Sequence, residues 1–199
     1  MTDFLTVSQI EYLRQIEVAP SAVLDARGMR RATYQSELKR QSKSLALVAN
    51  ACNKGHEARL RLSSGHCAQC SPIGLSKVKS RHKPGVVYIA FSKRLGVLKV
   101  GSASSSLDRA DGLNRDGYAG ATDWSLLYRR KFAEAGVVED RAHTALLPWK
   151  VRREYKRLGH GTTVNATEVF SCAYEQARDV LESCEDFALD PAIEFRGKM

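Results

Sequence analysis

Two pairs of cysteine and histidine residues lie close together in the sequence and have the chemistry of metal ligands. Cys52 and His56 are separated by three residues, and ten residues later Cys67 and Cys70 follow with two residues between them. The spacing of the second pair lets two thiolates reach one tetrahedral zinc ion, and the first pair supplies the other two ligands. Because four protein ligands fill a tetrahedral site, we expect a structural Zn²⁺ and no open position for catalysis.

Two questions about this cluster stay open in the sequence. Cys67 and Cys70 also have the spacing of a redox pair, and buried thiols without a metal are a further alternative. His66 precedes Cys67 directly and competes with His56, but a residue adjacent to a ligand usually points away from the ion, so we expect His56 to be the ligand. The segment resembles the small zinc knuckles that accompany phage and mobile-element nucleases, in which the metal supplies most of the folding free energy.

A second group of candidate residues begins in a predicted hairpin. Residues 86–91 and 97–101 are two apolar runs rich in β-branched and aromatic side chains, and the gap between them contains a glycine, which predicts an antiparallel pair of strands. Tyr88 and Lys99 place a phenol and an ammonium group in these runs. A polar group in a buried strand must find a partner or take part in function. A packed hairpin with a hydrogen-bonded tyrosine and a solvated lysine is the alternative.

Three more polar residues follow the hairpin. Arg109 lies in the first turns of a predicted short helix, and Glu139 and His143 lie four residues apart in a predicted helix at residues 134–147. Glu139 falls within the apolar stripe of that helix, where a carboxylate must be paired or bind a metal. A surface ion pair is the alternative for this pair of residues.

Taken in order, these residues resemble the GIY-YIG nuclease family. Residues 86–88 stand where that family has its first tripeptide, and residues 99–101 stand where it has the second, in the branch whose second motif reads K-(I/V)-G. Arg109 stands at the position of the helix arginine and Glu139 at that of the metal-binding glutamate. Residues 167–170 resemble the acidic-aromatic strand that closes the domain in one branch, and the role of Glu168 there is open.

The resemblance covers about residues 85–180 and implies an α+β fold with a small antiparallel three-stranded sheet flanked by helices. Residues 124–132 are expected to form the third strand. The predicted organisation of the whole chain is a helical arm at 1–50 that is a candidate for contact with DNA, a zinc knuckle at 51–72, a basic linker at 73–84 and a nuclease-like domain at 85–199.

The resemblance also implies hydrolysis of phosphodiester bonds with one divalent ion, Mg²⁺ or Mn²⁺, held by Glu139. Arg109 is then expected to hold phosphate oxygens, and Tyr88 to orient or deprotonate the attacking water. A phenol accepts a proton near neutral pH only if neighbouring cations lower its pKa, so His143 is the competing base. Lys99 replaces the family's second tyrosine, and whether it is catalytic or packs beside the site stays open.

The charge of the chain points to a polyanionic partner. The chain has 31 Lys and Arg residues and 22 Asp and Glu residues, which gives a formal net charge of +9. We therefore expect binding to DNA, most simply duplex DNA. A catalytically silent nucleic-acid-binding protein and a nuclease acting on RNA are the alternatives. The basic residues form three clusters: Arg27, Arg30, Arg31, Lys39, Arg40 and Lys43; Lys77, Lys79, Arg81, His82 and Lys83; and Lys150, Arg152, Arg153, Lys156 and Arg157.

The apolar residues indicate a packed core and no membrane segment. The hydrophobic fraction is 43%, and no apolar run reaches the ~18 residues that a transmembrane helix needs. The first residues also lack a basic segment followed by an apolar one. We therefore expect a cytoplasmic protein with reduced cysteines.

Overall fold

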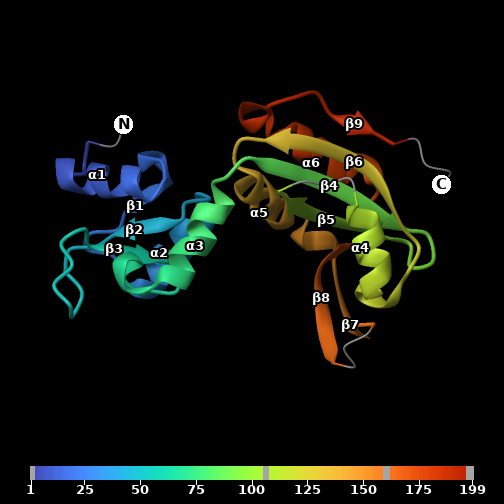
Figure 1. Ribbon diagram of the computed structural model, residues 1–199, viewed down its shortest axis with the longest axis horizontal. Coiled ribbons are helices and arrows are strands. Elements are labelled where there is room, and N and C mark those ends of the chain that lie inside the picture. Colours follow the sequence, from blue (N-terminus) through green and yellow to red (C-terminus); the bar gives the residue numbers. More distant parts are fainter. Residues whose placement is uncertain (1–2, 105–107, 159–161, 196–199) are drawn as a thin grey trace. The chain divides into compact units, whose positions relative to one another are not determined.

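The computed structural model describes residues 3–104, 108–158 and 162–195. The chain divides into two compact units, Met1–His82 and Lys83–Met199, which we call unit 1 and unit 2 (Figure 1).

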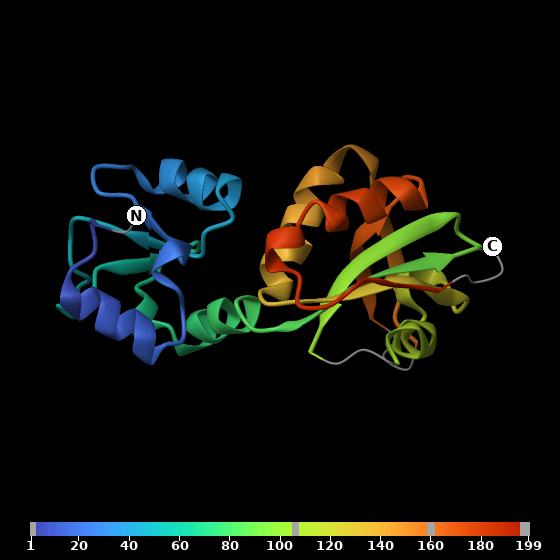
Figure 2. The ribbon, with the colours of Figure 1, turned by 90° about the horizontal axis from the view of Figure 1, so that it is seen from above.

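Unit 1 consists of a small sheet with helices on both faces. In the described part of this unit the elements are α1 (Val7–Gln15), η1 (Pro20–Ala22), β1 (Val23–Asp25), α2 (Arg31–Arg40), β2 (Leu45–Leu47), β3 (Leu60–Leu62), η2 (Ala68–Cys70) and α3 (Pro72–Arg81). The strand order is β1-β2-β3, with β1 parallel and β3 antiparallel to β2. Figure 2 shows α1 and α2 on opposite sides of these strands.

The core of unit 1 follows the alternation of β2. Leu45 and Leu47 pack in a cluster with Leu13 of α1, whereas Ala46 packs with Leu38 of α2 on the other face. Successive side chains of a strand point to opposite faces. A three-residue strand is therefore sufficient to connect the two helical layers.

The prediction of a purely helical arm was wrong. Within residues 1–50, which were expected to be helical, β1 and β2 are strands, Leu45 lies in β2, and α2 ends at Arg40. Ser42 has a positive φ of 53°, which turns the chain out of the helix. A strand of three residues is too short to show an alternation that differs from a helical stripe. The predicted basic linker at residues 73–84 is largely occupied by α3.

Unit 2 is built on a larger sheet. Over residues 83–104, 108–158 and 162–195, its strands are β4 (Gly85–Ser92), β5 (Val97–Ala103), β6 (Trp124–Phe132), β7 (Lys150–Lys156), β8 (Thr163–Phe170) and β9 (Ile193–Glu194). Their order is β7-β8-β5-β4-β6-β9, and every neighbouring pair is antiparallel. The helices are α4 (Arg109–Asp116), η3 (Tyr118–Gly120), α5 (Ala135–Ala145), η4 (Leu147–Trp149), α6 (Tyr174–Glu182) and η5 (Glu185–Phe187).

The two faces of this sheet are covered by different helices. Val87 and Ile89 of β4 pack with residues of α5 and α6, whereas Tyr88 and Ala90 pack with residues of α4 and η3. Figure 2 shows α5 and α6 on one side of β4 and β5, and α4 on the other. Because both faces are buried, the hairpin reads as two continuous apolar runs, as the sequence predicts.

The expected three-stranded sheet was also wrong, although the α+β class holds. The hairpin and the strand at residues 124–132 are present as β5 next to β4 and β4 next to β6. Beyond them, β7 and β8 extend one edge and β9 the other. β7 carries mainly charged side chains and β9 is exposed, so neither shows the apolar pattern from which a strand is predicted.

Within the described ranges, every helix is too short or too polar to span a lipid bilayer.

Candidate functional site

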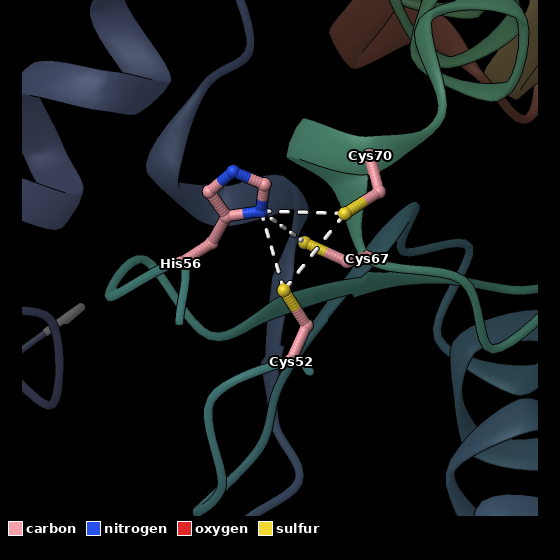
Figure 3. A group of neighbouring side chains, drawn as sticks. All are labelled: Cys52, His56, Cys67 and Cys70. Atoms are coloured by element: carbon pink, nitrogen blue, oxygen red, sulfur yellow. Dashed lines mark hydrogen bonds between the residues drawn. The ribbon is translucent and has the colours of Figure 1, made fainter. Parts of the chain in front are cut away.

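Unit 1 brings the four predicted metal ligands together. Cys52 and His56 lie in the loop after β2, and Cys67 and Cys70 flank the start and end of η2. Gly65 has a φ of +85°, a conformation that favours glycine, and it forms the tight turn that returns the chain from β3 to Cys67. The four ligand atoms all lie within 4.8 Å of one another. Figure 3 shows the three sulfur atoms and the imidazole Nδ1 pointing to a common centre.

Four of the six distances within the cluster are 3.8 Å or shorter. Nδ1 of His56 lies 3.2 Å from Sγ of Cys52, 3.6 Å from Sγ of Cys67 and 3.3 Å from Sγ of Cys70. The sulfur atoms of Cys52 and Cys70 are 3.8 Å apart. Three thiols and an imidazole held in this way form a site that could hold a metal ion.

The backbone around the cluster favours a thiolate at one position. The backbone N–H of His56, and to a smaller extent that of Lys54, forms a hydrogen bond with the sulfur of Cys52. These bonds lower the pKa of this thiol to about 6. Burial, followed by the neighbouring sulfur atoms, raises the pKa of Cys70. A metal ion prefers the thiolate form as its ligand.

The side chain of His66 turns away from the cluster. Its Nδ1 lies 3.0 Å from the hydroxyl of Ser64, and it is not among the four residues whose ligand atoms converge. His56 is therefore the histidine of the cluster in the described structure.

In unit 2, Tyr88 and Lys99 lie on the same face of the sheet. Tyr88 of β4 is paired with Gly101 of β5, and a Cβ atom at Gly101 would lie 2.7 Å from the Tyr88 hydroxyl and 3.1 Å from Nζ of Lys99. The Tyr88 hydroxyl and the Lys99 ammonium group therefore both lie next to Gly101, where the absence of a side chain leaves room for them. The glycine of the second predicted tripeptide is explained by this close approach.

Lys99 is buried but has partners. Its ammonium group donates a hydrogen bond to the carboxylate of Glu168 on β8 and lies 4.8 Å from the ring centroid of Tyr118. An ammonium group over an aromatic ring is stabilised by the ring quadrupole. Burial is the largest effect on Glu168 and opposes its ionisation, but the charge of Lys99 and its hydrogen bond, with smaller contributions from His143 and Lys150, together leave the pKa of this carboxyl group lowered.

Glu139 and Arg109 meet at Ser102. The carboxylate of Glu139 accepts hydrogen bonds from the backbone N–H of Ser102 at 3.1 Å and from its hydroxyl at 2.5 Å. The guanidinium of Arg109 donates to the carbonyl oxygen of the same residue at 3.3 Å. One residue near the end of β5 thus fixes a carboxylate from α5 and a cation from α4, with lone pairs of the carboxylate left for another ligand.

His143 is held through one ring nitrogen. Its Nε2 lies 3.0 Å from the carbonyl oxygen of Val100, and because a carbonyl only accepts, Nε2 carries the proton and donates. Nδ1 is then the nitrogen that has a free lone pair. The ring also packs against Phe170, with centroids 5.5 Å apart.

The Tyr88 hydroxyl is strongly disfavoured as an anion. Burial raises the pKa of Tyr88 to about 12, the positive charge of Arg109 opposes the rise, and the negative charges of Glu168 and Glu139 add to it. Tyr88 thus lies within electrostatic reach of three charged residues of the candidate site. In this state of the protein it is a neutral phenol at physiological pH.

The structure brings Tyr88, Lys99, Arg109, Glu139 and His143 to the two faces and one end of β5. Sequence reasoning missed two partners of these residues, Ser102 and Tyr118, and left Glu168 without a role. A signal for Glu168 exists, because a buried lysine in a strand requires an acidic partner.

Unit 2 carries paired charges and tyrosines on an antiparallel sheet, unit 1 carries a Cys/His cluster that could hold a metal ion, and the whole chain has a formal net charge of +9. The chain belongs to the T5orf172 domain family, whose model matches residues 85–185. Membership of this nuclease-associated family indicates a nucleic-acid-binding or nuclease-like function. A search of curated proteins and a search of solved structures gave no match.

The assignment to the GIY-YIG family was therefore wrong, since the matching model is that of the T5orf172 domain. The two tripeptides that suggested it are short. The pairing of Tyr88 with Gly101 has a packing cause, because the ring of the tyrosine lies where a side chain at Gly101 would be. Such a pair arises in a hairpin without indicating one particular family.

Proposed function

We propose that unit 2 is a metal-dependent nuclease that hydrolyses phosphodiester bonds in DNA. The observation that carries the proposal is the meeting of Glu139 and Arg109 at Ser102. A carboxylate and a guanidinium on neighbouring elements are the groups that bind a divalent cation and a phosphate. The family membership and the net charge of +9 support the same substrate class.

The donor set around Glu139 fits a hard divalent ion such as Mg²⁺ or Mn²⁺. Mg²⁺ is commonly held by one or two carboxylates together with waters and substrate phosphates. Such an ion, when bound, polarises the phosphate and stabilises the leaving oxygen. Ser102 holds the carboxylate of Glu139 in one orientation, and Arg109 grips phosphate oxygens through its guanidinium.

Tyr88 orients the attacking water as a neutral phenol. A hydroxyl both donates and accepts hydrogen bonds, and its raised pKa of about 12 opposes a role as proton acceptor. We assign that role to Nδ1 of His143, because Nε2 donates to Val100 and an imidazole accepts protons near neutral pH. Nζ of Lys99 lies 5.9 Å from the centroid of the Tyr88 ring, and its charge is balanced by Glu168.

Plasmid cleavage tests this proposal. We expect the full chain to nick or linearise supercoiled DNA when MgCl₂ is added, and Glu139→Gln to lower the rate by about 100-fold or more. Asp140→Asn is the matched control, since Asp140 is an exposed carboxylate on the same helix. No cleavage by the wild-type chain, or equal rates for wild type and Glu139→Gln, would overturn the proposal.

The same assay separates the alternatives. Plasmid bound in a gel shift but never cut indicates a nucleic-acid-binding protein without catalysis. Cleavage of structured RNA in place of plasmid reassigns the substrate.

For the cluster of unit 1, the proposed ion is a structural Zn²⁺ held by Cys52, His56, Cys67 and Cys70. In a tetrahedral site with Zn–S of about 2.3 Å and Zn–N of about 2.0 Å, ligand atoms lie roughly 3.5 to 3.8 Å apart. Four of the six separations are 3.2 to 3.8 Å, close to this geometry, and all six are within 4.8 Å. The zinc would stabilise unit 1, whose basic residues would add to DNA affinity. Metal analysis of protein purified without chelator should find one zinc ion per chain.

A further inference from the structure

The strands β7 and β8 form a ribbon that extends beyond the rest of the sheet (Figure 1). They pair with each other from Lys150 opposite Phe170 to Lys156 opposite Thr163. The inner neighbour, β5, pairs with β8 only at Phe170 and Val169. Over the described residues, the outer half of the ribbon therefore has no third strand beside it.

The two faces of this ribbon differ. Tyr155 and its cross-strand partner Val164 are half-buried, and the Tyr155 ring lies 5.6 Å from that of Tyr118. The opposite face, which we call the outer face, alternates with these positions and is exposed. It consists of Arg152, Glu154, Lys156, Thr163, Asn165 and Thr167.

The outer face is polar and carries a net positive charge. Of its six side chains, Arg152 and Lys156 are basic, Glu154 is acidic, and Thr163, Asn165 and Thr167 are uncharged. Arg157 is paired with Asp116 at 2.6 Å. The ion pairs of the described residues include neither Arg152 nor Lys156, so both cations are available to an anion.

We propose that the outer face of the β7–β8 ribbon enters the major groove of duplex DNA. This inference deepens the proposed function and rests on it for the choice of substrate. Strands of a sheet lie about 4.8 Å apart, and the major groove of B-DNA, about 12 Å wide, admits a two-stranded ribbon. The deep, narrow major groove of A-form RNA does not admit side chains in this way.

The side chains of the outer face fit the two kinds of contact that a groove offers. Arginine, asparagine and threonine hydrogen-bond to base edges, and lysine neutralises phosphates. Arg152, Asn165 and Thr167 supply the first kind and Lys156 the second. The ribbon begins next to the candidate site, because Val169 of β8 is paired with Lys99. A duplex held by the ribbon therefore lies beside the groups proposed to act on it.

Binding measurements on the full chain test the inference without relying on cleavage. The probes are a fluorescent mixed-sequence DNA duplex and the RNA duplex of the same sequence, measured without divalent ions. For R152A/K156A we expect an affinity for DNA lower by about tenfold or more, and a plot of log Kd against log salt that is shallower by about 1, since Lys156 is the phosphate contact of the two and each such contact contributes about 0.9.

Two further variants make the result specific. R152Q/K156Q removes the same charges with longer side chains and should behave like the alanine variant. K93A/K131A removes two positive charges from exposed positions elsewhere in unit 2, in the turn after β4 and on β6, and its affinity should stay within about twofold of wild type. Emission of Trp124 and Trp149 reports whether unit 2 stays folded in each variant.

The inference is overturned if the ribbon variants and K93A/K131A weaken DNA binding equally, if neither weakens it, or if the wild-type chain binds the RNA duplex as tightly as DNA. Its failure differs from that of the proposed function. A wild-type chain that never cuts DNA but loses binding in R152A/K156A supports the ribbon and refutes the nuclease. If the wild-type chain cuts DNA and R152A/K156A binds DNA as tightly as wild type, the nuclease proposal is supported and the ribbon inference is refuted.

Discussion

Lys99 and Glu168 form an ion pair across the neighbouring strands β5 and β8. The lysine side chain is 6% exposed and that of the glutamate 37%, so the pair closes one side of the candidate site with the cation inside and the anion toward solvent. A buried ammonium group is costly unless its partner is present. The pair therefore stabilises unit 2, besides any part it has in chemistry.

Loss of the carboxylate should destabilise unit 2. We expect Glu168→Gln to lower the free energy of unfolding by about 1–2 kcal/mol, because a hydrogen bond to a charged group is lost while solvent at the carboxylate moderates the effect. Urea unfolding followed by tryptophan emission measures it, since both tryptophans, Trp124 and Trp149, belong to unit 2. If Lys99→Met/Glu168→Gln is no more stable than Glu168→Gln, the unpaired lysine is not the cause.

The same pair predicts how stability depends on pH. The pKa of Glu168 is lowered in the folded chain from the ordinary 4.5, because burial, the largest effect, is exceeded by the combined contributions of Lys99, His143 and Lys150. The stabilisation is present above 4.5 and is lost as the pH falls through the lower pKa of the folded state. Urea unfolding at a series of acidic pH values should show a steeper loss of stability in wild type than in Glu168→Gln. Equal slopes would refute the linkage.

A methyl group at Gly101 should disturb the candidate site from within. In Gly101→Ala the new Cβ would lie 2.7 Å from the Tyr88 hydroxyl and 2.9 Å from its Cζ. We expect a loss of about 1–3 kcal/mol in stability from overpacking, and a larger loss of cleavage because the phenol is displaced. Gly112→Ala is the control. Gly112 lies inside α4, and among the described residues the nearest atom to a Cβ there is Nη2 of Arg115, 4.0 Å away, so alanine there should stabilise the helix by roughly 0.5–1 kcal/mol.

The parts of the fold that the sequence predicts are those with a continuous local pattern. The apolar runs of β4 and β5 and the strand at Trp124–Phe132 could be read directly, because burial selects β-branched and aromatic residues there. The ribbon could not. β7 alternates charged residues with half-buried ones, and its inner face is defined by Tyr118, a residue far from it in sequence.

The candidate site shows the same division. Cys67 and Cys70 could be predicted as co-ligands because local spacing brings their thiols together. The contact between Glu139 and Ser102 could not, since it depends on how α5 packs against β5. A base requires a lowered pKa, whereas the pKa of Tyr88 is raised by burial. The sequence could not predict this direction, because it reveals neighbouring cations but not how deeply the phenol is buried.

The raised pKa of Tyr88, about 12, predicts a spectroscopic result. Without divalent ions, the phenol should stay protonated through the range near pH 10 where an exposed tyrosine ionises. The difference in tyrosinate absorbance between wild type and Tyr88→Phe should therefore remain flat until the protein reaches more alkaline pH. A step near pH 10 in that difference would mean that Tyr88 is accessible to water and would reopen its role as a base.

Removal of the proposed zinc should affect one unit and spare the other. Unit 1 has short strands of three residues and its loops meet at the Cys/His cluster, so a bound ion would supply folding free energy there. We expect a strong chelator, or Cys67→Ser, to melt unit 1 by circular dichroism and limited proteolysis while tryptophan emission of unit 2 is unchanged. Cys172→Ser is the control, because Cys172 is a free cysteine outside the cluster. Retention of full secondary structure by metal-free protein would contradict the structural role of zinc.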